Sequence, residues 1–281
     1  MADTTSEVRP VPEQSPSARI DPSVPHPARR YDYWLGGKDN FAADRQSGDA
    51  VAAAYPAIRT TVIENRRFMQ RATRYLAEAA GIRQFLDIGT GIPTSPNMHE
   101  VAQGIAPESR VAYVDNDPIV LAHARALLTS SPAGSTAYVD ADLRDPERIL
   151  SHPDIRATID FDRPVGLMLV AMLHFLTDAD DPYGITGRLL EALPSGSYLV
   201  ISHATTDLVP REVAATAAPV TTTSMIDMAF RTRDEFATFF DGLELVPPGI
   251  SPITEWHPDT PAEQRLPAAQ ASMYGAVARK P

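Results

Sequence analysis

The spacing of apolar residues changes along this chain, and its first clear pattern is helical. From Asp44 onward, apolar side chains recur every three or four residues, as on one face of an amphipathic helix, and Gly81 is a suitable stop. The pattern therefore predicts helix between about residues 44 and 81. Four arginines lie largely off the apolar stripe and are expected on a solvated face: Arg66, Arg67, Arg71 and Arg74.

Beyond residue 81, short apolar runs alternate with turns and helical segments. This alternation predicts an α/β fold with a mostly parallel sheet, and the nearly all-apolar run at 164–170 is typical of a strand buried on both faces. A helix near 234–240, followed by two strands joined by a Pro-rich loop, predicts a closing antiparallel hairpin and seven strands in all. The expected strands are the run into Asp87 and residues 110–114, 136–139, 164–170, 197–202, 243–246 and 272–278.

Residues 85–93 read Phe-Leu-Asp-Ile-Gly-Thr-Gly-Ile-Pro, which predicts a buried strand, a glycine turn and the start of a helix. Gly89 and Gly91 allow backbone to approach a ligand closely, and free N–H groups at a helix start favour a carboxylate or phosphate. Thr94 replaces the third glycine of a dinucleotide fingerprint, and no Gly-Lys-Ser/Thr phosphate loop occurs. The turn therefore suits a nucleoside with a small carboxylate tail, such as S-adenosylmethionine, better than a diphosphate. A glycine turn without a ligand is the plainer alternative.

Acidic residues follow the second and third expected strands. Asp115 lies roughly two dozen residues past the glycines, where such folds grip a ribose diol, and a carboxylate can accept from both hydroxyls. Asp117 is more simply the cap of the next helix. After the third strand, one of the acids, among them Asp140 and Asp142, is a candidate to accept from an exocyclic amine, with Leu143 packed on the base. The alternative is that these acids only cap the turn.

Two histidines follow expected strands at the edge of the sheet where ligands bind. His174 comes just past the fourth strand, and open α/β sheets keep their ligand crevice at the carboxyl ends of strands. We weigh a functional and a structural role for His174 equally. His203 follows the fifth strand at the equivalent edge and is the weaker candidate.

The N-terminal part of the chain divides into a tail and an aromatic arm. Residues 1–28 are rich in Pro, Ser and charge, and we expect a disordered or loosely draped tail. Residues 29–281 are expected to form a single domain, in which 29–54 are an arm or lid. The aromatics of the arm either stack on a ligand ring or only pack on the domain; they are Tyr31, Tyr33 and Trp34, followed by a possible hinge at Gly36 and Gly37.

The composition excludes several classes of function. The chain has 281 residues, a formal net charge of -11 and no cysteine, so disulfides, thiolate metal sites and cysteine nucleophiles are absent. The charge disfavours binding to nucleic acid or to an anionic membrane surface. The seven histidines are scattered, which makes a metal site an unfavourable hypothesis. No apolar run approaches the roughly 18 residues of a membrane span, and a cytoplasmic protein is expected.

The ordered motifs resemble those of class I S-adenosylmethionine-dependent methyltransferases. The resemblance covers about residues 55–280 and implies a seven-stranded Rossmann-like sheet of order 3-2-1-4-5-7-6 with the seventh strand antiparallel. The arm sequence at 31–41, the turn at 86–93 and the segment 169–175 are more specific, because together they resemble an actinobacterial S-adenosyl methyltransferase family formerly known as a domain of unknown function. This closer resemblance covers nearly the whole chain after residue 28. It implies the fold and the cofactor but names no substrate.

Under this resemblance, the chain would move a methyl group from S-adenosylmethionine to an O, N or C nucleophile of a small molecule, leaving S-adenosylhomocysteine. His174 is the candidate base or substrate contact. The expected cofactor residues are Asp87 near the ammonium, the turn of Gly89, Thr90 and Gly91 at the methionine tail, Asp115 at the ribose, Asn116, Asp142 and Leu143 at the adenine, and Ala171. The expected substrate or lid residues are Tyr31, Tyr33, Gly36, Asn40 and His203.

Two alternatives stay open. A non-catalytic sensor or partner-binding protein would use the same cofactor residues, and a pocket filled by side chains beside the methyl group would favour it. An NAD-dependent oxidoreductase would fit Asp115 but not Thr94 and its flanking prolines. The acceptor and the oligomeric state do not follow from the sequence.

Overall fold

A computed structural model describes residues 20–127, 129–216 and 228–281 and is built on one central sheet. The strand order is β3-β2-β1-β4-β5-β8-β6, with β7 paired to β8 outside this path. Strands β1 to β5 pair in parallel with their neighbours, and β8 is antiparallel to β5, β6 and β7. The predicted α/β class and strand order are confirmed, with the short β7 as one strand more than expected. The strands are β1 Gln84–Ile88, β2 Arg110–Asp115, β3 Ser135–Asp140, β4 Gly166–Val170, β5 Tyr198–Ala204, β6 Glu244–Leu245, β7 Ser251–Pro252 and β8 Met273–Arg279.

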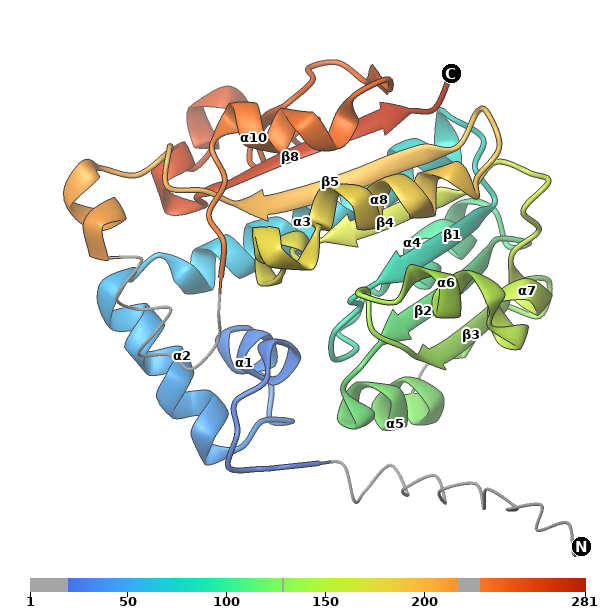
Figure 1. Ribbon diagram of the computed structural model, residues 1–281. Coiled ribbons are helices and arrows are strands. Elements are labelled where there is room, and N and C mark those ends of the chain that lie inside the picture. The colour runs from blue at the N-terminus through green and yellow to red at the C-terminus, as the bar shows by residue number, and fades with distance from the viewer. Residues whose placement is uncertain (1–19, 128, 217–227) are drawn as a thin grey trace, which may run out of the picture.

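Helices cover both faces of the sheet, and two more lie beyond the ends to which the arrowheads of β1 and β5 point (Figure 1). These two helices are α1 and α2, and they pack on each other and on α3. None of the helices in the described residues is long and apolar enough to cross a membrane. The helices are α1 Pro27–Trp34, α2 Ala42–Ala54, α3 Ile58–Glu78, α4 Met98–Ile105, α5 Pro118–Leu127, α6 Pro146–Ser151, α7 Pro153–Thr158, α8 Pro182–Glu191 and α10 Arg233–Ala237, with the short 3-10 helices η2 Leu173–Phe175, η3 Asp178–Asp180, η4 Thr238–Phe240, η5 Ala262–Gln264 and η6 Ala268–Gln270.

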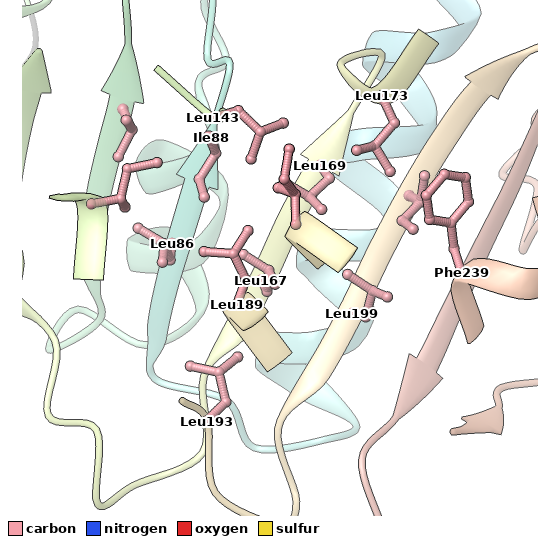
Figure 2. Close-up of a cluster of buried hydrophobic side chains, with 14 of the residues drawn as sticks. Leu86, Ile88, Leu143, Leu167, Leu169, Leu173, Leu189, Leu193, Leu199 and Phe239 are labelled. Atoms are coloured by element: carbon pink, nitrogen blue, oxygen red, sulfur yellow. The ribbon is translucent and has the colours of Figure 1, made fainter. Parts of the chain in front are cut away.

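Alternate residues of the central strands feed two separate cores. In β1, Leu86 and Ile88 join the core under α6, α7, α8 and α10, while Phe85 joins the core under α3 and α4. A strand's side chains point to opposite faces in turn, so a strand covered on both faces is buried throughout and mostly apolar. Every residue of β1 is buried accordingly, polar Gln84 and Asp87 included. Figure 2 shows the first of these cores, with Leu86, Ile88, Leu167, Leu169 and Leu199 facing the helical layer.

The predicted helix between residues 44 and 81 is two helices. Tyr55 leaves the helical region with φ -134° and ψ 83°, because Pro56 restricts the residue before it. Arg71 was predicted to lie on a solvated face of the helix. This prediction is wrong, because Arg71 is only 6% exposed. Its guanidinium donates to the carbonyl oxygens of Trp256 at 2.9 Å and Ile253 at 2.5 Å, so Arg71 ties α3 to the C-terminal loop.

Leu167→Ala on β4 is expected to lower the free energy of unfolding by about 2–5 kcal/mol, because the side chain is fully buried between strand and helix. Urea denaturation followed by circular dichroism measures this change. Leu245→Ala is the matched control, since Leu245 is 42% exposed and the same truncation there should cost about 0.5 kcal/mol or less. Equal effects of the two variants would contradict this assignment of the core.

Candidate functional site

A cavity of 380 Å³, here called the main cavity, lies at the carboxyl ends of β1, β2 and β4. Open α/β sheets bind ligands at this edge. The strand order reverses between β1 and β4, so the loops that follow these two strands run in opposite directions and leave a crevice between them. The turn after β1, the end of β2, the loops after β3 and β4, and helices α1 and α3 all contribute walls. The predicted site residues that line it are Asp87, Gly89, Thr90, Gly91, Asp115, Asn116, Leu143, Ala171 and Tyr31.

The glycine turn after β1 needs both of its glycines. Gly89 and Gly91 have φ values of 78° and 69°, in the left-handed region that other residues rarely adopt. A Cβ at Gly89 would also lie 2.4 Å from the Sδ of Met172. A Cβ at Gly91 would meet nothing within 4 Å, so its backbone faces open space. The turn therefore offers bare backbone to the main cavity.

Asp115 ties this turn to β2. One carboxylate oxygen accepts from the N–H of Gly91 and the other from the N–H of Asp117, each at 2.9 Å. Asp115 is 6% exposed, and burial raises its pKa. Each carboxylate oxygen has a second lone pair, so these bonds leave capacity for hydroxyl donors in the main cavity.

Asp87 places a second buried acid in the main cavity. Burial raises its pKa to about 7, while the hydroxyl of Thr90 and the guanidinium of Arg66 oppose the shift. Near neutral pH this carboxyl is therefore poised between its two protonation states. A cation bound in the cavity would favour the ionised form.

Two predicted adenine residues differ in their position. Leu143 is 1% exposed and lines the main cavity, whereas Asp142 does not line it. Asp142 instead accepts from Nδ2 of Asn116 at 2.8 Å and from the N–H of Arg144 at 2.8 Å. Asp142 therefore holds the amide of Asn116, which does line the cavity.

Helix α1 covers the main cavity and is anchored by ion pairs. Asp117 caps α5 by accepting from the N–H of Ile119, as predicted. Its other carboxylate oxygen lies 3.0 Å from Nε of Arg29 and 3.1 Å from Nδ1 of His26. Residues 1–19 of the predicted tail lie outside the described residues, but its end, at His26 to Ala28, lines the cavity.

Three predicted lid residues do not reach the cavity. Tyr33 donates its hydroxyl hydrogen to Asp49 at 2.7 Å, and Asn40 donates to Asp32 at 2.8 Å. Gly36 ends α1, with its N–H bonded to a carbonyl oxygen of that helix and a φ of 85°. These residues shape the arm itself.

Tyr31, which lines the cavity, begins a chain of hydrogen bonds that crosses the site. Its hydroxyl donates to the carbonyl of Val62 at 2.9 Å and accepts from Nδ2 of Asn65 at 3.0 Å. The Oγ of Ser202 donates to Oδ1 of Asn65 at 2.6 Å and accepts from the N–H of Ala171 at 2.9 Å. Ala171 has a φ of 55°, a conformation that costs a non-glycine residue energy and persists where neighbours fix it. The chain of bonds supplies that constraint.

A second cavity of 130 Å³, here called the apolar pocket, adjoins the main cavity. Its walls are mostly apolar, with Trp34, Val51, Ile58 and Val62 among them. The polar groups among its lining residues include Arg30 and His174. The residues that line both cavities are Pro27, Tyr31, Ala171 and Phe175.

The two candidate histidines have different environments. His174 lines the apolar pocket, and burial, with His203 and two arginines nearby, lowers its pKa well below the usual value. His203 lines neither cavity. Its Nδ1 donates to the carbonyl of Ala204 at 2.8 Å and its Nε2 accepts from Arg231 at 2.9 Å, so both ring nitrogens are used within the fold. The geometry does not support the predicted substrate contact by His203.

Sequence reasoning missed two arginines at these cavities. Arg66 was expected in solvent but lines the main cavity, and it donates to the carbonyl oxygens of Thr94 and Pro96. Arg30, which lines the apolar pocket, was not singled out. The sequence did contain a signal for Arg30. Arg29 and Arg30 stand directly before the aromatic residues of the arm, and charges beside aromatic side chains are unusual in a tail.

The sequence profile of a family described as S-adenosyl methyltransferase matches residues 13–281. The chain belongs to this family. A DUF574 family protein from Streptomyces avermitilis is 53% identical, with a TM-score of 0.89 over 94% of this chain and 100% of that one. A protein from Thermobifida fusca, provisionally assigned as a methyltransferase, is 42% identical, with a TM-score of 0.83 over 92% and 96% of the two chains. No curated protein matches.

The family assignment confirms the predicted resemblance and the predicted cofactor, S-adenosylmethionine. The main cavity of this S-adenosyl methyltransferase fits that cofactor in its chemistry. Two buried acids, Asp87 and Asp115, offer acceptors for an ammonium and for ribose hydroxyls, and Arg66 offers a cation for a carboxylate. Buried Leu143 offers an apolar surface for a ring.

Asp87→Asn is expected to stabilise the cofactor-free protein at pH 8 relative to wild type, and to do so less at pH 5. The folded-state pKa of Asp87 is about 7 and its unfolded value is about 3.9. The folded state therefore binds more protons between these values, and wild-type stability falls as pH rises through that window. Thermal unfolding at both pH values measures the difference. Asp162→Asn, at an exposed position, is the control. A shift in Tm independent of pH would contradict this environment for Asp87.

Proposed function

We propose that this chain transfers a methyl group from S-adenosylmethionine to a small-molecule acceptor held in the apolar pocket. The observation that carries the proposal is the junction of the two cavities, where Pro27, Tyr31, Ala171 and Phe175 line both. A donor in the main cavity and an acceptor in the apolar pocket would meet at this junction. The net charge of -11 favours a small molecule over nucleic acid as the acceptor.

Residues of the main cavity have complementary roles in this proposal. The backbone of Gly89 to Gly91 holds the methionine tail, Asp87 its ammonium and Arg66 its carboxylate. Asp115 accepts from the ribose hydroxyls. Asn116, oriented by Asp142, and Leu143 form the adenine site. The bound cofactor supplies a methyl group already activated on a sulfonium.

The chain's own contribution is mainly alignment and exclusion of water. Proximity and orientation can supply up to ~7–11 kcal/mol of the barrier. Helix α1, anchored at Asp117, covers the main cavity, and Tyr31 and Ala171 fix the junction through the chain of hydrogen bonds. No covalent chemistry is required of the protein in this arrangement.

His174 serves as a substrate contact in this proposal. The backbone nitrogen of Ala204 lies 3.5 Å from Nδ1 of His174 and donates its hydrogen to it, which places the ring proton of the neutral imidazole on Nε2. In this tautomer Nε2 donates a hydrogen bond to an oxygen atom of the methyl acceptor. Its lowered pKa also makes His174 a weak base, so proton removal from the acceptor is not assigned to it.

The open apolar pocket supports an enzyme over a sensor. A protein that only senses the cofactor needs no space beside the methyl group, and we expected side chains to fill it in that case. A cytoplasmic location and the 29–281 domain with its arm at 29–54 stay predictions alongside this proposal.

S-adenosylhomocysteine at about 100 times its dissociation constant is expected to stabilise the protein by roughly 2.7 kcal/mol, whereas NADH should leave Tm unchanged. Thermal unfolding with each compound measures the difference. Stabilisation by NADH alone would overturn the proposed function.

Asp115→Ala is expected to weaken binding of S-adenosylhomocysteine tenfold or more, because the ribose loses its acceptor and the turn at Gly91 loses its tie to β2. Isothermal titration calorimetry measures the affinity. Asp162→Ala, exposed and outside the main cavity, should bind as wild type does. Unchanged affinity of a folded Asp115→Ala variant would refute the ribose assignment.

A further inference from the structure

Arg30 brings a buried cation to the apolar pocket, and the acid that stabilises its charge, buried Asp44, does so from beyond ion-pair distance. Arg30 is 1% exposed and lines the pocket from α1. Its Nη1 donates to Oγ of Ser47 at 3.3 Å and its Nη2 to Sδ of Met228 at 3.8 Å, which are long contacts. Its Nε has no hydrogen-bond partner. Within the described ranges 20–127, 129–216 and 228–281, no carboxylate oxygen lies within 4.0 Å of the guanidinium.

Two other buried arginines near the site are neutralised. Arg29, the preceding residue, lies 3.0 Å from a carboxylate oxygen of Asp117. Arg231 lies 3.0 Å from Asp178 and also donates to two backbone carbonyl oxygens at 3.2 Å. A buried charge without a counter-ion is costly, so folds pair such groups or keep them for a ligand. Arg30 is the exception in this region.

The apolar pocket contains no other charge to balance Arg30. No acidic residue is among its described lining residues. Burial lowers the pKa of Arg30 to about 10 although the carboxylate of Asp44, which does not line the pocket, opposes the shift; the guanidinium is therefore charged at neutral pH. The hydroxyl of Tyr55 is bonded to the carbonyl of Ala269 at 3.0 Å and that of Ser272 to the carbonyl of Thr205 at 2.7 Å. An anion inside the pocket would therefore find a single cation, with the ring of His174 and threonine hydroxyls such as that of Thr205 as further donors.

Resting on the proposed function, we propose that the acceptor is a small, mainly apolar molecule with one carboxylate, which Arg30 binds. The guanidinium carbon of Arg30 lies 5.0 Å from the centre of the Trp34 ring, a cation–π contact. The planar edge formed by its two Nη atoms makes only the long contacts with Ser47 and Met228, which a ligand could replace. That edge matches a carboxylate bidentately. A single cation suits one negative charge, and apolar walls such as Val51 and Ile58 suit a ring or short aliphatic body. The cofactor carboxylate has a different cation, Arg66, in the main cavity.

The test compares carboxylic acids with their neutral amides on the full chain loaded with S-adenosylhomocysteine. Small aryl and short-chain acids, such as benzoate and phenylacetate, are titrated by calorimetry beside benzamide and phenylacetamide. At least one acid is expected to bind tenfold or more tightly than its amide. If every amide binds as well as its acid, or if no acid binds, the carboxylate proposal is overturned.

Variants then assign the preference to Arg30. Arg30→Met should remove the acid's advantage over the amide, and Arg30→Lys should retain part of it because the charge remains. Arg74→Met, a surface arginine of α3 paired with Asp259, is the matched control and should behave as wild type. An undiminished preference in Arg30→Met would overturn the assignment, and the wild-type comparison still decides if that variant does not fold. Failure of S-adenosylhomocysteine to bind wild type would refute the proposed function, whereas normal binding without acid preference refutes only the carboxylate.

Discussion

The acidic turn that ends β2 holds both walls of the main cavity. Asp115 accepts the N–H of Gly91 and so fixes the glycine turn after β1. Two residues later, Asp117 pairs with Arg29 of the N-terminal arm and lies 3.1 Å from Nδ1 of His26, which precedes the arm. One short segment therefore sets the distance between the ligand-facing backbone and the helix that covers it. A ligand in the cavity must fit between two surfaces that are tied to the same strand end.

The regular part of the fold was predictable because its signals are local. Short apolar runs, turn residues and capping residues indicate strands and helix starts within a few positions of the chain. Asn97, for example, opens α4 with a capping box to Glu100. The division of α2 from α3 at Pro56 and the two-residue strand β7 were missed, the first because the apolar stripe continues past the proline and the second because its pairing with β8 is long-range.

Much of the lining of the main cavity was predictable for the same reason, and the rest of the two cavities was not. Asp87, Gly91 and Asp115 follow strand ends, which parallel topology brings to one edge. Whether an arginine faces solvent or a cavity depends on partners far along the chain. Arg71 meets carbonyl groups about 180 residues away. The positions of Tyr33 and Asn40 depend on how the arm folds on itself, and periodicity does not encode this.

The two adjoining cavities differ in the sign of the buried charge that a ligand would meet. The main cavity has a buried acid, Asp87, whose pKa is raised by burial to about 7 although Arg66 opposes the shift. The apolar pocket has a buried cation, Arg30, whose pKa is lowered by burial to about 10 although Asp44 opposes the shift. Tyr31, with a pKa raised to about 12, stands neutral between them. Under the proposed function, a cationic donor is favoured on one side and an anionic acceptor on the other. Because exchange of the two would place like charges together, charge as well as shape would orient the reactants. Burial of these two groups also lowers the stability of the ligand-free fold, so this selectivity has a cost in stability.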